Sequence, residues 1–158
     1  MSFYRDRTIL PMLLAVALLA GSLSLRLEER ARAQMPTQPG LTVEQRSELI
    51  GAERLNEQVA QLYQQGKFNA AIPLAEQALA IRKHILGENH PDVATSLNNL
   101  AKLYHDQGRY TEAEPLYQRS LQIREAQLGK DHPHVATSLN NLAALYRAQG
   151  RYPEAEPL

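Results

Sequence analysis

This sequence repeats itself every 42 residues. The segment 90–116 returns at 132–158, and the two copies differ at only five of 27 positions. A glycine followed two residues later by an aromatic residue recurs at Gly66, Gly108 and Gly150, so the period also reaches an older copy. A unit of this length cannot bury its own apolar face, and the copies are therefore expected to stack into a solenoid. The period assigns three repeats: a degenerate one at 48–89, a second at 90–131 and a truncated third at 132–158.

Each repeat carries the pattern of two helices. In the second repeat, apolar residues recur at helical spacing between Pro91 and Gly108, namely Leu97, Leu100, Ala101 and Tyr104. The run 111–114 (TEAE) has the form of a capping box, which predicts the start of a second helix. Pro115 is then expected in its first turn, and Gly129 at its end in a left-handed cap. The unit is therefore helix–turn–helix, and the predicted fold class is all-α.

These positions carry a resemblance to a known family. With a glycine in the turn, the following residues match the positions that define a tetratricopeptide repeat: Leu97, Leu100, Ala101, Tyr104, Tyr110, Ala113, Tyr117 and Leu121. The chain resembles that family over 48–158. Its period and the runs LNNLA-x-LY, EAEPLYQRSLQIRE and LG-x-x-HP are similar to the kinesin-light-chain subtype. The resemblance implies a right-handed superhelix of helical repeats, whereas a HEAT-type array shares the period but not these positions.

The resemblance also implies a binding surface, because in this family one face of each first helix lines a concave groove. On that face lies a ladder of asparagines, one per repeat: Asn56, Asn98 and Asn140. An amide both donates and accepts hydrogen bonds, so the ladder is expected to hold the backbone of an extended peptide. The alternative is that these asparagines only join helices, as is expected for Asn99 and Asn141. The other residues predicted to line the groove are Tyr63, Thr95, Lys102, His105, Thr137 and Arg147. The lysine, histidine and arginine among them would favour carboxylates.

The sequence gives little support for catalysis or metal binding. It has no cysteine, and it shows no set of nucleophile, base and orienting group. The residues that suggest a metal site lie in the turns between repeats, and they are His90, Asp92, Asp131, His132 and His134. An Asn or Asp beside His-Pro is typical of a helix start, so a structural role is preferred. We expect no cofactor, no metal and no enzyme activity.

The N-terminal part reads as a targeting segment. Residues 1–33 are expected to be a signal peptide, since two arginines precede an apolar run from Ile9 to Ala20 and a small-x-small site ends at Ala33. An uncleaved membrane anchor over 9–25 is one alternative, and a cytosolic chain is another. Residues 34–47 are assigned as linker and lead-in. We therefore expect an exported protein, periplasmic or secreted.

Charge limits the classes of partner. Without residues 1–33, the chain keeps 12 basic and 14 acidic residues, with no basic excess for nucleic acid or an anionic membrane. Membrane contact is expected only through an uncleaved N-terminal segment. The expected partner is a protein or peptide.

Together these features favour a bacterial-type scaffold that binds an extended segment of another protein. The resemblance supports this class, because kinesin-light-chain-like repeats bind peptides in their groove. One alternative is that the repeats form the recognition part of a longer enzyme, such as a caspase-like protease of the CHAT type. The other is a structural role, with copies associating end to end through the third repeat.

Overall fold

The computed structural model describes residues 40–158, and within this range the chain forms six helices. They are α2 (Val43–Gln64), α3 (Phe68–Leu86), α4 (Pro91–Asp106), α5 (Tyr110–Leu128), α6 (Pro133–Ala148) and α7 (Tyr152–Ala155). No strand occurs among the described residues, and the all-α prediction is confirmed. None of the helices between residues 40 and 158 is both long and apolar enough to cross a membrane. The predicted signal peptide at 1–33 lies outside the described residues.

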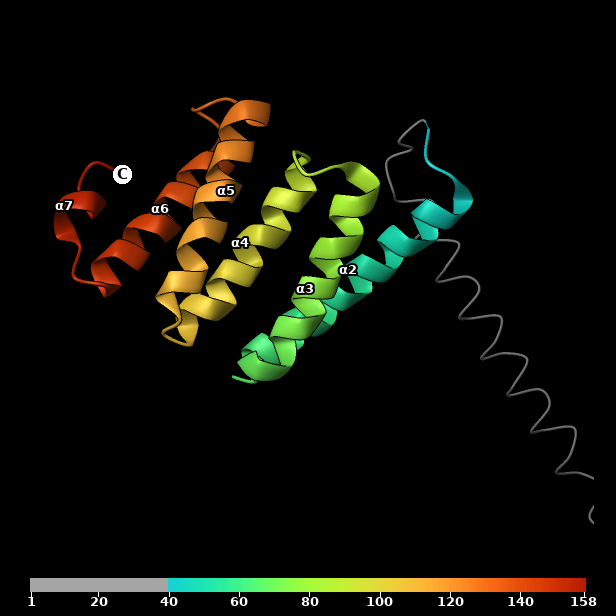
Figure 1. The fold of residues 1–158 in the computed structure, drawn as a ribbon, viewed down its shortest axis with the longest axis horizontal. Helices are drawn as coiled ribbons and strands as arrows, with labels where there is room; N and C mark the ends of the chain where they lie inside the picture. The colour runs from blue at the N-terminus through green and yellow to red at the C-terminus, as the bar shows by residue number, and fades with distance from the viewer. Residues whose placement is uncertain (1–39) are drawn as a thin grey trace, which may run out of the picture. The chain divides into compact units, whose positions relative to one another are not determined.

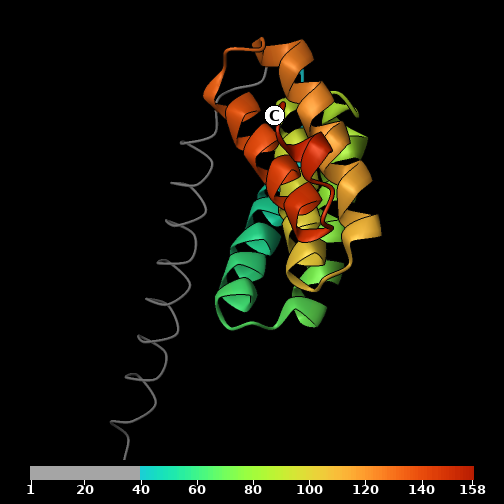
Figure 2. The same cartoon turned by 90° about the vertical axis from the view of Figure 1, so that its left-hand side faces the viewer.

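The helices pack in chain order. Each helix contacts the next one along the sequence, and α4 also contacts α6 (Figure 1). The view of Figure 2 shows α2 and α6 on one side of the stack and α3 and α5 on the other. The first and second helices of the repeats thus form separate layers, as a stack of helix–turn–helix units requires. α2 begins five residues before position 48, where the first repeat was expected to start.

The core follows the predicted apolar stripe. In α4 the stripe residues are at most 8% exposed, and they are Leu97, Leu100, Ala101 and Tyr104. In α5 the buried residues include Ala113, Tyr117, Ser120 and Ile123. Full burial of one leucine side chain contributes about 1.5–3 kcal/mol, so this stripe supplies much of the stability of the stack.

A repeated backbone turn joins the two helices of each repeat. After α4, Gly108 has a φ of +74°, a left-handed conformation that other residues rarely adopt. The N–H of Gly108 bonds the carbonyl of His105 at 2.8 Å, and the N–H of Arg109 bonds the carbonyl of Tyr104 at 2.9 Å. These two bonds form a Schellman motif, which satisfies carbonyls at the end of the helix. Equivalent bonds close α2 and α6.

The predicted capping box at the start of α5 is wrong. Because the glycine turn leads directly into the helix, α5 begins at Tyr110 and Thr111 already lies inside it. The N-cap residue is Arg109, whose side chain makes no capping bond. A capping box does form at the start of α2. There the N–H of Thr42 donates to Gln45 Oε1 at 2.9 Å, and the N–H of Gln45 donates to Thr42 Oγ1 at 3.1 Å.

Two further expectations about α5 need correction. Pro115 is the sixth residue of the helix, so it lies in the second turn and not the first. Its missing N–H leaves the carbonyl of Thr111 without a helical partner, and Thr111 is exposed, so water can solvate that carbonyl. At the other end, Gly129 has a φ of +85° and a ψ of 155°. This is an extended glycine conformation and not a left-handed helical cap.

Candidate peptide-binding surface

The nine residues predicted to line a groove all lie on the first helices of the repeats, and we call their surface the first-helix face. They are Asn56 and Tyr63 on α2, Thr95, Asn98, Lys102 and His105 on α4, and Thr137, Asn140 and Arg147 on α6. The structure separates them into a cluster that joins α2 to α4, an amide pair that joins α4 to α6, and side chains without a hydrogen bond or ion pair to another helix among residues 40–158.

Three of the nine meet in one cluster together with Asp106. The hydroxyl of Tyr63 donates to Asp106 Oδ2 and accepts from Lys102 Nζ. Lys102 Nζ lies 3.8 Å from the centre of the Tyr63 ring and 3.6 Å from Asp106 Oδ2. On the other side of the carboxylate, His105 Nδ1 is 2.9 Å from Asp106 Oδ1. This tyrosine cluster links the C-terminal ends of α2 and α4, and its charges compensate each other within the protein.

The surroundings of Asp106 favour its ionised form. Burial opposes ionisation, but the hydrogen bonds from Tyr63 and His105 and the charge of Lys102 outweigh burial and hold the pKa of Asp106 below its usual value. An ionised carboxylate only accepts, so Nδ1 of His105 carries the proton of this bond. Nε2 of the same ring is the only buried side-chain nitrogen or oxygen between residues 40 and 158 without a hydrogen-bond partner. The i,i+4 spacing of Lys102 and Asp106 was a sequence signal for this ion pair.

The asparagine ladder is not uniform. Asn98 is only 8% exposed, and its Oδ1 accepts a hydrogen bond of 2.9 Å from Asn141 Nδ2. The expectation that Asn141 bonds a neighbouring helix is therefore confirmed, whereas the same expectation for Asn99 is wrong, because Asn99 is exposed and its side chain has no hydrogen bond among residues 40–158. Asn56 is half-buried and Asn140 is exposed, and neither side chain has a hydrogen bond within the described part of the chain. The oxygen of the Asn98 amide is thus already hydrogen-bonded, whereas the oxygen and the nitrogen of the Asn56 and Asn140 amides are both available to a ligand.

The remaining residues of the first-helix face are exposed. Thr95 and Thr137 donate to backbone carbonyls of their own helices at 3.3 and 3.0 Å. The side chain of Arg147 is exposed and takes part in no ion pair or hydrogen bond among residues 40–158. Lys102 and Arg147, which sequence reasoning treated alike, therefore differ. The lysine is engaged by Asp106, and the arginine is available to a ligand.

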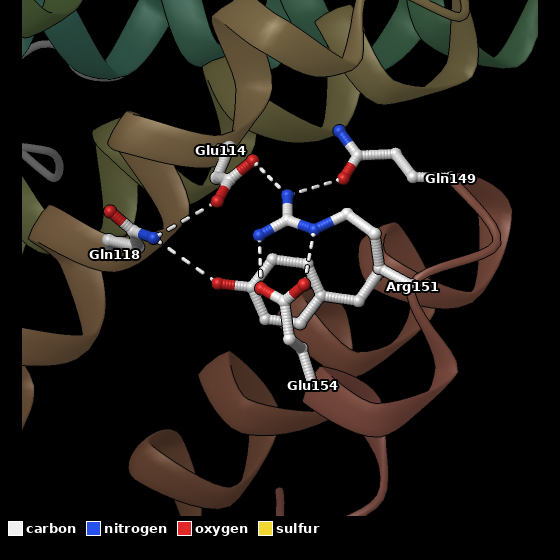
Figure 3. Close-up of polar contacts among 6 residues, drawn as sticks. Glu114, Gln118, Gln149, Arg151 and Glu154 are labelled. Carbon is white, nitrogen blue, oxygen red and sulfur yellow. Dashed lines mark hydrogen bonds and ion pairs between the residues drawn. The ribbon is translucent and has the colours of Figure 1, made fainter.

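A second arrangement, which was not predicted, places an arginine over a tyrosine after the turn glycine of the second and third repeats. Figure 3 shows the third-repeat example, in which the guanidinium of Arg151 lies 4.3 Å from the Tyr146 ring centre. Arg151 donates to both oxygens of Glu154 and, across the junction, to Glu114 Oε2 at 2.6 Å. These hydrogen bonds raise the pKa of Arg151. Arg109 lies over Tyr104 at the same 4.3 Å. The recurring Tyr-x-x-x-Gly-Arg was the signal in the sequence.

Two buried arginines were also missed. Arg82 in α3 and Arg124 in α5 are each 5% exposed and lie 42 residues apart. The Nη1 atoms donate to serines of the next first helix, from Arg82 to Ser96 at 2.7 Å and from Arg124 to Ser138 at 2.8 Å. Each arginine therefore joins two consecutive repeats through its Nη1 atom.

The histidines between repeats are helix caps. Nδ1 of His90 accepts from the N–H of Asp92, and Nδ1 of His132 accepts from the N–H of His134, both at 3.1 Å. The helix-start interpretation is therefore confirmed, although the capping residue is the histidine and not the Asn or Asp before it. Among residues 40–158, no group of three or more His, Cys, Asp or Glu side chains could hold a metal ion.

Comparisons with known proteins agree on the architecture. A family model described as "Tetratricopeptide repeat" matches residues 52–126 and 97–158, and no curated protein sequence matches the chain. The solved structure of BtubC (BKLC) from P. vanneervenii is 30% identical, with a TM-score of 0.63 over 67% of this chain and 42% of that one. Two structures of a kinesin-light-chain-type protein from Podosopora anserina, with nearly identical TPR-like repeats, are also 30% identical. Their TM-score is 0.61 over 66% of this chain and 49% of theirs. This chain thus spans less than half the length of these solved relatives.

Proposed function

The chain belongs to the tetratricopeptide repeat family, and we propose that its first-helix face binds an extended segment of another protein. Repeats of this family generally serve as scaffolds for protein–protein interactions, and the similar solved structures include kinesin-light-chain-like proteins. The role proposed for these repeats is binding and not catalysis.

The asparagine ladder carries this proposal. It has one asparagine per repeat, spaced 42 residues apart, on α2, α4 and α6. The hydrogen bond from Asn141 to the oxygen of Asn98 orients the Asn98 amide. It leaves Nδ2 of Asn98 to donate to a carbonyl of the partner. A peptide backbone offers one N–H and one carbonyl at almost every residue. Amides spaced one repeat apart therefore suit an extended chain with little regard to its side chains.

The test removes the two amides that have no structural bond. Partners are first captured with arrays of short synthetic peptides, and their affinities for the variants are then measured by calorimetry. Because each lost hydrogen bond costs about 1 kcal/mol, the double variant Asn56→Ala, Asn140→Ala should bind roughly tenfold more weakly or worse. Asn98 is left in place, since its removal would also break the bond between α4 and α6.

Asn99→Ala is the matched control, because Asn99 is exposed and lies one residue off the ladder. It should leave affinity unchanged, and circular dichroism should show equal helicity for all variants. If every captured peptide binds the double variant as tightly as the wild type, the ladder does not form the binding site.

We also propose that the protein is exported, on the basis of the sequence pattern in 1–33. Mass spectrometry of the mature N-terminus, on protein made in its native host, should find Gln34 as the first residue. An intact Met1 in a soluble cytosolic fraction would contradict export. An intact Met1 in the membrane fraction would select the anchor over 9–25.

A further inference from the structure

The two buried arginines have different partners although they occupy equivalent positions. At the first junction between repeats, Arg82 donates from Nη1 to Ser96 Oγ and from Nη2 to Glu53 Oε1, the latter at 2.6 Å. Glu53 belongs to the first helix of the same repeat, and its side chain is 55% exposed while that of Arg82 is 6% exposed. The carboxylate therefore reaches the buried arginine from the solvent side.

At the second junction, Arg124 also bonds a serine of the next repeat, but it has no carboxylate partner like Glu53 in the described part of the chain. Arg124 donates from Nη1 to Ser138 Oγ at 2.8 Å and to the carbonyl of His134 at 3.0 Å. Thr95 takes the position that Glu53 holds one repeat earlier, and its shorter side chain bonds the backbone of its own helix. No acceptor among residues 40–158 bonds Nη2 of Arg124.

Arg124 is thus a buried cation without a counter-ion. Burial lowers the pKa of Arg124, and an arginine in a protein nevertheless stays charged. The only fully buried side-chain polar atom without a partner in the described residues is on His105, so Nη2 of Arg124 keeps contact with solvent. A carboxylate that arrived there would form a charge-assisted hydrogen bond in a largely desolvated place, where such bonds are strong.

We infer that the open side of Arg124 is a subsite for an acidic side chain, Asp or Glu, of the peptide that binds the first-helix face. This inference rests on the proposed function. Thr95 precedes Asn98 by three residues, about one helical turn, so a backbone held by the ladder passes close to the subsite. The protein's own Glu53 shows how a carboxylate fits against an arginine in this position.

The first experiment supplies the carboxylate from the protein itself. Thr95→Glu should close the subsite and raise the melting temperature by about 4 °C or more above that of Thr95→Gln, which has the same size without the charge. Thr137→Glu is the matched control for added charge. It adds the same charge at the equivalent position of the third repeat, where the side chain of Thr137 is exposed and bonds only its own helix, and it should melt like the wild type.

The second experiment uses peptides. Short synthetic peptides that bind the wild-type chain are remade in pairs that differ only by Glu or Gln at one position, and that position is moved along the peptide. At one register the Glu form should bind about tenfold more tightly. This preference should disappear in Thr95→Glu and persist in Thr137→Glu.

The outcomes separate the two proposals. If peptides bind but no register prefers Glu, or if the preference survives in Thr95→Glu, the subsite is overturned and the proposed function stands. If Thr95→Glu melts no higher than Thr95→Gln, Arg124 does not accept a carboxylate and the subsite is again overturned. If no peptide binds the wild-type chain, both proposals fail.

Discussion

The two junctions between consecutive repeats are built from equivalent helices and differ in their polar contacts. At the first junction, Tyr63 of α2 bonds Lys102 and Asp106 of α4, and every charge in this cluster is compensated. At the second junction, Ala144 and Ala148 occupy the positions of the lysine and the aspartate. The arginine–serine bond is thus repeated from one junction to the next, whereas the charged cluster around Tyr63 is not.

The second junction therefore leaves positive charge without a partner. Arg147 on its surface makes no ion pair within residues 40–158, and the buried Arg124, which bonds the start of α6, has no carboxylate partner. The first junction has Glu53 at the corresponding arginine. The acidic partner that we propose would therefore find uncompensated positive charge at the second junction.

The strongest test of this comparison replaces each buried arginine by methionine. Arg82→Met should cost about 2–3 kcal/mol, because it removes the bonds to Ser96 and Glu53. Arg124→Met also removes two bonds, to Ser138 and to the carbonyl of His134, but it takes away an uncompensated buried charge as well, so it should change stability by less than about 1 kcal/mol. Urea unfolding monitored by circular dichroism measures both. Equal costs would show that the two junctions are energetically alike.

A smaller effect should appear with pH at the first junction. Asp106 has a lowered pKa in the folded protein. Its contribution to the free energy of unfolding is therefore complete above the usual aspartate pKa of about 4, and it is lost as the pH falls through the lowered value. Asp106→Asn should therefore be less stable than the wild type by about 1 kcal/mol at pH 7. This difference should shrink below about pH 4.

Urea midpoints measured at steps of pH test this dependence. Asp131→Asn is the control, because Asp131 is exposed and lies outside the cluster, and it should match the wild type throughout. A difference between Asp106→Asn and the wild type that stayed constant down to pH 2 would contradict the role given to the carboxylate.

The smallest effects should separate the two cations of the first-helix face. Lys102→Ala should lower stability by up to about 1 kcal/mol and leave the affinity for acidic peptides unchanged, because the lysine is engaged by Asp106. Arg147→Ala should leave stability unchanged and weaken the binding of acidic peptides a few-fold. The affinity of these peptides should also depend less on salt. Thermal unfolding and calorimetry at two salt concentrations measure these effects. If both variants weaken acidic peptides equally, the first junction also binds ligands.

The repeated and local features of the fold were predictable from sequence. The apolar stripe that contains Leu97 and Tyr104 follows the spacing of an α-helix, and a glycine such as Gly108 after such a stripe indicates the end of the helix. The capping box failed for a local reason as well. The helix starts before Thr111, and the carboxylate of Glu114 accepts from Arg151 and Gln118 instead.

Contacts between repeats were harder to predict, because they join residues that are far apart in the chain. The bond from Tyr63 to Asp106 spans 43 residues, and no local pattern indicates it. The recurrence of Arg82 and Arg124 one period apart is visible in the sequence. An arginine in an amphipathic helix is nevertheless usually solvated, so the burial of these two needed the structure.

The Schellman turn is made entirely of contacts within one helix pair. The backbone N–H of Arg109 bonds the carbonyl of Tyr104, and the guanidinium of the same arginine lies over the ring of the same tyrosine. Closing so short a loop costs little chain entropy, so a pair can begin to fold before its neighbours have done so. Duplication or deletion of one 42-residue unit in the gene would leave every turn intact. Only the residues at the new junction would then need to adapt, which gives such arrays a simple evolutionary route to a different length.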